Sequence, residues 1–516
     1  MKYQVEVNIP PDYINDNLYL KNKVVKKLKI SPNVITAIKI VRRSLDSRKK
    51  PVYRVLVEVY VGEELENTIE RINYTSVSSE KKVIIVGFGP AGMFATLRLI
   101  ELGVKPIIIE RGKDVQARRR DLRDLQQEHN VNPDSNYCFG EGGAGTYSDG
   151  KLYTRSLKRG NVKKILNVLV QHGADDDIFI NAHPHIGSNI LPKIVTSISN
   201  TITNCGGEII FNSKVTDFII KDKKLIGVIV NDKEEFFGDA VILATGHSAR
   251  DVYYLLHKHK IKIEPKPFAI GVRIEHPQSL INEIQYHSKT KNENLPAASY
   301  NLSCTVDYKG VYSFCMCPGG IIVPAATAKN EIVINGMSLS RRDSPFANSG
   351  LVVSVGENEW KNYNDNYPFN GLKLQQENEQ LAFRLANYSQ AAPAQRVTDF
   401  IEGKYSQTLP AASYIPGLTS ARLDIELPDF ITHRLKIALK VFNEKMKGYY
   451  TEEAQIVIPE SRTSSPIRIP RNRDSFMHED IIGLFPTGEG AGYAGGIVSA
   501  AIDGDNCANA VEKYLI

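Results

Sequence analysis

The stretch VIIVGFGPAG at residues 83–92 decides the fold of this chain of 516 residues. Residues 83–86 are apolar without a break, which is typical of a parallel strand covered on both faces. Three glycines follow, residues 93–102 have the spacing of an amphipathic helix, and residues 105–109 predict a second strand. The order is that of a strand–helix–strand unit with a glycine-rich first turn.

The spacing Gly87-x-Gly89-x-x-Gly92 has a physical reason at each glycine. The first permits a tight turn, the second lets the backbone approach a pyrophosphate, and the third lets the helix pack against the strand. Glu110 ends the second strand, where its carboxylate can accept hydrogen bonds from ribose hydroxyls. A purely structural turn is the alternative, but the complete unit favours dinucleotide binding. The residues predicted to bind here are Gly87, Gly89, Pro90, Ala91, Gly92, Glu110 and Arg111.

A C-terminal element indicates which dinucleotide is bound. Residues 482–492 predict a strand that runs into a glycine-rich turn, and a helix rich in small residues follows over 498–510. FAD enzymes with two dinucleotide domains hold the flavin with such an element, and the strand end at 244–246 (ATG) fits the same scheme. A glycine-rich helix packed for its own sake is the alternative. The residues predicted to bind FAD here are Thr245, Gly246, Gly488, Glu489, Gly496 and Ile497.

A second glycine cluster occupies residues 139–151 (FGEGGAGTYSDGK). Its glycines would let the backbone pass close to a flat ligand. We interpret it as a loop along the isoalloxazine ring, with Gly142 and Gly143 contacting the cofactor and Lys151 near the ring. A mobile surface loop is the other interpretation.

Composition excludes several classes of protein. With 42% hydrophobic and 24% charged residues, the chain is neither globally disordered nor fibrous. No apolar stretch reaches the roughly 18–20 residues that span a bilayer, and the start lacks a signal-peptide pattern. Six cysteines show neither a disulfide framework nor zinc spacing, so no metal site is expected. These features predict a cytoplasmic protein without a membrane partner.

The fold class predicted from these patterns is α/β, in three parts. Residues 1–76 form a small basic α+β module, with fourteen Lys and Arg against nine Asp and Glu. Residues 77–260 together with 476–516 form a Rossmann-type FAD-binding domain. Residues 261–475, richer in strands, form an inserted, mainly antiparallel β cap domain that holds the substrate.

Seven motifs together resemble those of a known family, the uncharacterised FAD-dependent dehydrogenases, also called NAD(FAD)-utilising dehydrogenases. The resemblance spans essentially the whole chain and implies bound FAD and the fold of the glutathione-reductase-type flavoproteins. It leaves the substrate open. The motifs are VIIVGFGPAGMFA (83–95), FGEGGAGTYSDGKL (139–152), GVRIEHPQ (271–278), CMCPGG (315–320), NGMS (335–338), SRTSSPIRI (461–469) and GEGAGYAGGI (488–497).

The candidates for the reaction itself are Arg273, Glu275 and Lys151. Arg273 and Glu275 alternate along a predicted strand and therefore share one face. If that face looks at the flavin, Arg273 would hold an anionic substrate and Glu275 would orient it. A buried ion pair on a structural strand is the alternative.

Two further motifs allow more than one interpretation. Arg462 and Arg468 suggest a phosphate or carboxylate site, or equally a solvated loop. Cys315 and Cys317 lie two apart on a predicted strand and would face the same way, either as a redox pair or, more simply, as inert buried thiols.

The function predicted from the sequence is that of an FAD-dependent oxidoreductase, acting on a small-molecule substrate or electron acceptor. The chain has no second Gly-x-Gly-x-x-Gly unit, so either NAD(P)H would bind transiently in the cap cleft as the donor, or the organic substrate itself would reduce the flavin. One alternative is an RNA-associated flavoprotein that acts on or binds tRNA through the basic N-terminal module, residues 1–76. The basic stretch 39–54 in this module lacks a run of aromatic residues for base stacking, and an exposed hairpin turn is the simpler interpretation of it. Another alternative is a binding protein in which FAD is structural.

Overall fold

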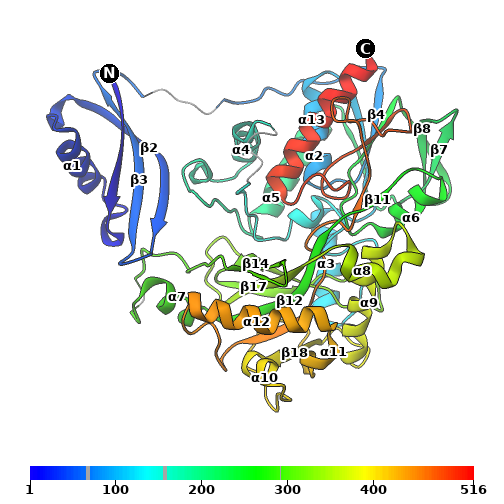
Figure 1. Cartoon of the computed structure of the whole chain (residues 1–516). Helices are drawn as coiled ribbons and strands as arrows, with labels where there is room; N and C mark the ends of the chain where they lie inside the picture. Colours follow the sequence, from blue (N-terminus) through cyan, green and yellow to red (C-terminus); the bar gives the residue numbers. More distant parts are fainter. Residues whose placement is uncertain (66–69, 155–159, 291) are drawn as a thin grey trace.

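The computed structural model describes residues 1–65, 70–154, 160–290 and 292–516, and these form three parts (Figure 1). A small module holds the N-terminus, and a parallel sheet with its helices holds the C-terminus. A larger sheet with its own helices forms the third part. No helix within the described ranges is both long enough and apolar enough to cross a membrane.

The first large layer is a five-stranded parallel sheet in the order β22-β10-β4-β5-β6. Alternate residues of β4 face opposite sides, as a two-sided core requires. Val83 and Ile85 pack with the helices, whereas Ile84 and Val86 pack with a three-stranded meander and α6. The strands of the sheet are β4 (Lys82–Val86), β5 (Lys105–Ile109), β6 (Glu208–Ile210), β10 (Ala240–Leu243) and β22 (Leu484–Pro486).

The helices predicted over 93–102 and 498–510 and the meander strands predicted over 215–220 and 225–230 are present around this sheet, whereas four further helices and the short strand β9 were not predicted. The helices are α2 (Pro90–Glu101), α3 (Val115–Gln127), α4 (Val162–Gln171), α5 (Leu191–Asn204), α6 (Arg250–Lys258) and α13 (Ile497–Leu515). The meander consists of β7 (Val215–Lys221), β8 (Lys224–Val230) and β9 (Glu234–Phe237).

Helices α2 and α13 lie side by side across this sheet (Figure 1), and their backbones touch. A Cβ atom at Gly504 of α13 would lie 2.0 Å from the carbonyl oxygen of Ala91 in α2. A Cβ at Gly92 would lie 2.1 Å from the carbonyl oxygen of Gly87. Glycine is therefore required at both positions, and this contact brings the two helix starts to the same end of the sheet.

The third part contains a seven-stranded sheet in the order β13-β14-β17-β12-β20-β18-β19, antiparallel except for β18 and β19. The paired strands β11 and β21 lie where the chain enters and leaves this part. Its strands are β11 (Glu264–Pro265), β12 (Phe268–Pro277), β13 (Ser303–Val306), β14 (Lys309–Cys317), β15 (Gly320–Pro324), β16 (Ile334–Ser338), β17 (Phe346–Val355), β18 (Ala392–Arg396), β19 (Leu418–Ser420), β20 (Gln455–Glu460) and β21 (Ile467–Arg468).

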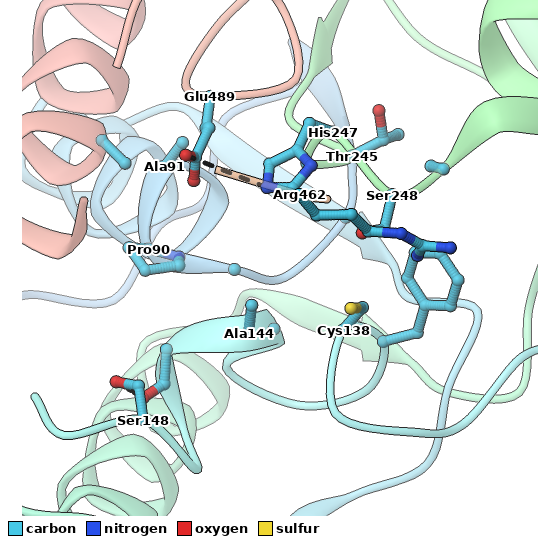
Figure 2. A pocket seen from close by; sticks show the side chains of 18 of the residues that line it. Pro90, Ala91, Cys138, Ala144, Ser148, Thr245, His247, Ser248, Arg462 and Glu489 are labelled. Carbon is cyan, nitrogen blue, oxygen red and sulfur yellow. Dashed lines mark hydrogen bonds and ion pairs between the residues drawn. The ribbon is translucent and has the colours of Figure 1, made fainter. Parts of the chain in front are cut away.

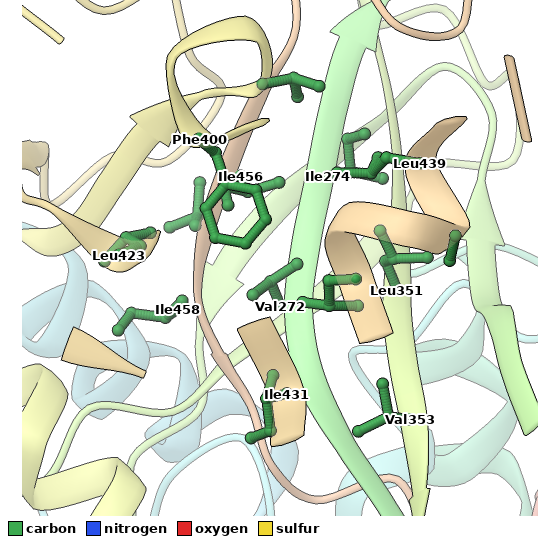
Figure 3. Packing of buried hydrophobic residues seen from close by; sticks show 14 of the residues in the cluster. Val272, Ile274, Leu351, Val353, Phe400, Leu423, Ile431, Leu439, Ile456 and Ile458 are labelled. Atoms are coloured by element: carbon green, nitrogen blue, oxygen red, sulfur yellow. The ribbon is translucent and has the colours of Figure 1, made fainter. Parts of the chain in front are cut away.

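Two long helices, α9 (Asn370–Leu385) and α12 (Asp429–Lys445), cover one face of this sheet, and the sequence analysis did not predict them. In α12, Ile431, Leu435 and Leu439 repeat at intervals of four and pack against Val272 and Ile274 (Figure 3). That spacing was a detectable helical signal within a segment interpreted as mainly strand. The helices of this part are α7 (Gln278–Tyr286), α8 (Glu357–Trp360), α9 (Asn370–Leu385), α10 (Val397–Glu402), α11 (Leu423–Glu426) and α12 (Asp429–Lys445).

The N-terminal module is a three-stranded antiparallel sheet in the order β1-β3-β2, with a helix packed on one face. Several basic residues of the stretch 39–54 form ion pairs within the chain. Arg43 pairs with Asp177 of the neighbouring part, Arg48 pairs with Asp46, and Arg54 pairs with Glu6. The RNA contact through this module stays a prediction. The elements are β1 (Lys2–Ile9), α1 (Asn17–Leu28), β2 (Ile35–Asp46) and β3 (Val52–Val61).

The contact between α2 and α13 predicts the effect of one methyl group. We expect Gly504→Ala to lower stability by about 1–3 kcal/mol, because the added Cβ forces the two helices apart. The matched control is Gly356→Ala, where the nearest side-chain atom would be 3.5 Å from the new Cβ. Thermal unfolding followed by circular dichroism checks this: equal midpoints for the two variants would contradict the close approach.

Candidate active site

A cleft of about 280 Å³ lies between the carboxyl ends of the parallel strands and the third part of the chain (Figure 2). Parallel sheets bind ligands at this edge because loops and helix starts converge there. Most of the residues predicted to bind a cofactor line the cleft. They are Gly87, Gly89, Pro90, Ala91, Glu110, Arg111, Gly143, Thr245, Gly246, Glu489, Gly496 and Ile497, together with Lys151.

Three predicted cofactor residues lie behind the wall instead, where their lack of a side chain permits close packing. Gly92 packs against Gly87, as described above. A Cβ at Gly142 would lie 2.0 Å from the hydroxyl of Thr146. A Cβ at Gly488 would lie 2.7 Å from that of Ala91. We therefore assign these three glycines to shaping the cleft.

Two helix N-termini face the cleft without a capping side chain. Gly89 precedes α2 and Gly496 precedes α13, and neither helix start has a side-chain cap. Helix α3, by contrast, is capped by Asp114. A Cβ at Gly496 would have no heavy atom within 4 Å, and at Gly89 the nearest would be 3.9 Å away. The amide N–H groups and positive dipole ends therefore face open space, which is an arrangement that binds anions.

Glu110 sits at the end of β5 as predicted, but its carboxylate already accepts three backbone hydrogen bonds. The donors are the amides of Phe88 (2.8 Å), Gly112 (2.9 Å) and Gly140 (2.9 Å). Glu110 thus ties the first glycine turn to the second glycine cluster. Its neighbour Arg111 forms an ion pair with Asp251 and lies over the ring of Phe139.

The second glycine cluster is fixed in the interior. Arg118 of α3, which has no exposed surface, donates to three carbonyl oxygens along it. The acceptors are Asn136 (2.7 Å), Glu141 (2.9 Å) and Gly143 (2.8 Å). These hydrogen bonds argue against the interpretation of residues 139–151 as a mobile surface loop. The sequence analysis missed Arg118, because nothing distinguishes it from the arginines beside it on the same helix.

Lys151 ends this cluster at the cleft wall. Its ammonium nitrogen lies 3.1 Å from a carboxylate oxygen of Asp149 and 3.4 Å from the sulfur of Cys317. The side chain is 35% exposed, so the charge is compensated but accessible from the cleft.

The structure corrects the prediction that Cys315 and Cys317 face the same way. A β-bulge between Phe314 and Cys317 interrupts the pairing of β14 with β17. Within it, Cys315 has a φ of 44°, in the left-handed region that non-glycine residues rarely adopt. Cys315 is consequently exposed in the cleft, whereas Cys317 is buried beside Lys151.

Arg273 and Glu275 do share one face of β12, but both are buried beneath the cleft wall. Arg273 has no exposed surface and donates to Glu460 (2.7 Å) and Asn348 (2.7 Å). Glu275 accepts from the amide and hydroxyl of Ser413. The alternative of a buried ion pair therefore describes Arg273, and the predicted direct contact with a substrate is corrected. Glu460, the carboxylate that is paired with Arg273, lines the cleft.

Four charged residues with largely buried side chains join helix α6, which packs on the parallel sheet, to the third part of the chain. Arg250 pairs with Glu331 (3.2 Å) and Glu379 (2.8 Å), and Arg462 pairs with the same two carboxylates (3.2 and 2.9 Å). Arg462 also lines the cleft, while Arg468 is exposed on β21. The solvated-loop interpretation thus fails for Arg462. This network links residues more than 200 positions apart, and no sequence signal pointed to it.

The two carboxylates of this network differ in pKa. Burial opposes ionisation of Glu379, but Arg250 and Arg462 outweigh it and lower the pKa of Glu379 to about 2. Burial and the adjacent Glu379 carboxylate raise the pKa of Glu331 to about 7. One negative charge is therefore held firmly against the two arginines.

His247 and Glu489 point toward one another across the cleft wall, 3.9 Å apart (Figure 2). Burial, followed by the positive charges of Arg462 and Arg250, lowers the pKa of His247 to about 3. Burial raises the pKa of Glu489 to about 7, opposed by Lys266. The imidazole is thus neutral at physiological pH. The sequence analysis missed His247, although it directly follows the ATG strand end.

The difference in pKa between Glu379 and Glu331 can be tested by replacing each residue with glutamine. At a pH between their two pKa values, Glu379→Gln is expected to cost about 3–5 kcal/mol of stability, because it leaves two buried arginines uncompensated. Glu331→Gln is expected to cost far less, since Glu331 is already protonated there. Denaturant unfolding of both variants checks this expectation.

The pH dependence adds a sign to this prediction. The pKa of Glu379 is lowered in the folded chain, so its contribution is present above about pH 4.5 and is lost as pH falls toward 2. The difference in free energy of unfolding between wild type and Glu379→Gln should therefore decrease as pH falls from about 4.5 toward 2. A stability difference that does not change with pH would refute the lowered pKa of Glu379. Equal losses of stability in Glu379→Gln and Glu331→Gln would refute the different pKa values of the two carboxyl groups.

Two family models match parts of this chain. Residues 267–463 match a family described as FAD-dependent protein, C-terminal domain-like, and residues 1–60 match a domain family of unknown function. Among solved structures, glycine oxidase from Bacillus cereus is 14% identical, with 84% of this chain and 96% of that chain covered and a TM-score of 0.30. Glycerol-3-phosphate dehydrogenase from Bacillus halodurans complexed with FAD is 11% identical, with 85% and 66% covered and a TM-score of 0.35.

A relative from Clostridium beijerinckii, an uncharacterized protein, is 40% identical over 524 residues, which cover 97% of this chain and 97% of the relative. Identity at this level over nearly the full length of both chains shows common family membership. The chain therefore belongs to the family of this Clostridium beijerinckii protein.

Proposed function

We propose that the protein is an oxidoreductase that binds FAD in the cleft between the parallel sheet and the cap domain, residues 261–475. The observation that carries the proposal is the meeting of two uncapped helix N-termini, α2 and α13, at one cleft. One such terminus suits a pyrophosphate, and a second suits the electron-rich pyrimidine edge of a flavin. FAD has both features in one molecule.

The residues of the cleft fit this cofactor. Gly89 leaves room in front of α2 that a side chain would fill, and Gly495 and Gly496 do the same in front of α13. The backbones at Gly89 and Gly143 approach closely, since a Cβ at Gly143 would lie 2.9 Å from the Cα of Gly89. The pyrophosphate would be held by the amides at the start of α2, and the isoalloxazine by the second glycine cluster and the start of α13.

Bound FAD would supply the redox chemistry, and the chain would supply position and charge. The amides at the start of α13 stabilise negative charge that develops at the pyrimidine edge. The cap closes the opposite side with residues of β14, β16 and β20, which leaves space for a small substrate or acceptor. NAD(P)H, without a dinucleotide unit of its own, would enter this same space as a transient donor.

The first prediction of this proposal concerns Gly89. Its φ of −79° suits any residue, and the new Cβ would meet no atom closer than 3.9 Å, so Gly89→Ala should fold normally. The methyl group would occupy the approach path of the pyrophosphate, so we expect FAD affinity to fall by about tenfold or more. Quenching of flavin fluorescence on titration into the apoprotein measures this. Wild-type affinity in a folded Gly89→Ala protein would contradict the assignment.

The second prediction concerns the reductant. The purified protein should show the visible spectrum of a flavin, and anaerobic mixing with NADH or NADPH should bleach it if a nicotinamide is the donor. A flavin that stays oxidised would redirect the search to reduced organic substrates. A flavin that no reductant changes, at full occupancy, would instead support a structural cofactor.

A further inference from the structure

We propose that Glu460 is the group that delivers and accepts a proton at the substrate end of the cleft, and that the buried Arg273 positions it. The inference rests on the proposed function, because the electron pair must come from or go to the bound flavin. It narrows the substrate to a molecule whose two-electron reduction takes up a proton on oxygen or nitrogen, or whose oxidation releases one.

The placement of Glu460 is the first support. It ends β20, lines the cleft, and is only 3% exposed. Its Oε2 accepts from Nε of Arg273 at 2.7 Å. Among the described residues, its Oε1 has no hydrogen-bond partner. One carboxylate oxygen is therefore anchored while the other is available to a ligand in the cleft.

The hydrogen bonds that fix the Arg273 guanidinium are the second support for the proposal. Its Nη1 donates to the side-chain oxygen of Asn348 at 2.7 Å, so the guanidinium is fixed from two sides. Gly336 covers it on the cleft side, where a Cβ would lie 2.2 Å from Nη1. Arg273 is thus shielded from the cleft and acts through Glu460, as a positioning residue.

The charges around Glu460 leave it able to change protonation state. Arg273 faces it from the adjacent strand β12. Cys315 and Cys317 lie on β14, which is separated from β12 by β17, and Lys151 lies beside Cys317. Burial raises the pKa of Glu460, and Arg273 only partly opposes that effect. Glu110, in contrast, is saturated by three amides, and Glu489 belongs to the loop 488–497 that we assign to the cofactor.

The step balances with the flavin as electron donor. An acceptor such as a quinone would take a hydride from the bound reduced flavin: an N–H bond of the flavin breaks, the flavin is oxidised by two electrons, and one C–H or O–H bond forms on the acceptor, which leaves a negative charge on its oxygen. The Glu460 carboxyl O–H bond then breaks, its proton neutralises that oxygen, and the resulting carboxylate regains a proton from water. Substrate oxidation runs the same transfers in reverse.

The test uses the full-length holoprotein, reduced anaerobically, with menadione as the acceptor. In wild type, the rate of flavin reoxidation should fall as pH rises through the pKa of Glu460, because the acid form is required. Glu460→Gln should slow the step by about 10²-fold at low pH and remove this pH dependence, and Glu460→Asp should restore it. Arg273→Lys should move the midpoint of the profile to higher pH, since the ion pair is weakened.

The matched control is Glu359→Gln, which removes another buried cap carboxylate, paired with Lys309 and Arg434 and remote from the cleft. It should leave the pH profile unchanged. A wild-type profile in Glu460→Gln would overturn the proposal, as would loss of the pH dependence in Glu489→Gln but not in Glu460→Gln.

A second readout needs no bound flavin. Cys315 is exposed in the cleft near Glu460, so its rate of alkylation by iodoacetamide reports the local charge. Removal of the carboxylate charge in Glu460→Gln should accelerate alkylation severalfold at a pH where wild-type Glu460 is ionised. An unchanged rate would overturn the placement of Glu460, whereas failure of the purified protein to bind FAD would refute the proposed function alone.

Discussion

The contact of the α2 and α13 backbones is the constraint on which the rest of the structure depends. Gly504 places its helix against the carbonyl oxygen of Ala91, at a distance that no side chain allows. Because of this contact, two helices from opposite ends of the chain begin at the same edge of one sheet (Figure 1). Their N-termini then supply positive potential to a single cleft, and a larger residue at position 504 would separate them. The first turn and the C-terminal element therefore act as one binding unit.

The cap sheet completes the site through strand alternation. Val272 and Ile274 face the core under α12, so Arg273 must face the opposite side, toward the cleft (Figure 3). A fully buried guanidinium is costly unless it is paired and hydrogen-bonded. Glu460 and Asn348 meet that requirement, and one of the two, Glu460, reaches the cleft as a consequence. A structural demand of the sheet thus places a carboxylate at the substrate end.

Local patterns predicted the parallel sheet well, because its strands and its glycine turns are encoded over a few adjacent residues. The helix α12 was missed although its spacing was detectable, since the strand-rich surroundings dominated the interpretation. Cys315 could not be oriented from the sequence, because one bulge reverses the alternation of a strand. The pairing of Arg250 with Glu331 and Glu379 depends on how two separate parts of the chain pack, which no local pattern records.

The pairing of the cations in the cleft indicates which groups are left to bind an anionic cofactor. Arg111, Lys151 and Arg462 all line it, and each is already paired with a carboxylate of the chain. Their positive charges are therefore largely neutralised by carboxylates of the protein. An anionic cofactor would accordingly be bound mainly by the backbone amides at the starts of α2 and α13. Amides in a fixed geometry have no flexible side chain to order and no counterion to displace. Cofactor binding through them should depend weakly on salt, in contrast to binding through surface lysines and arginines, where screening acts directly on the charges.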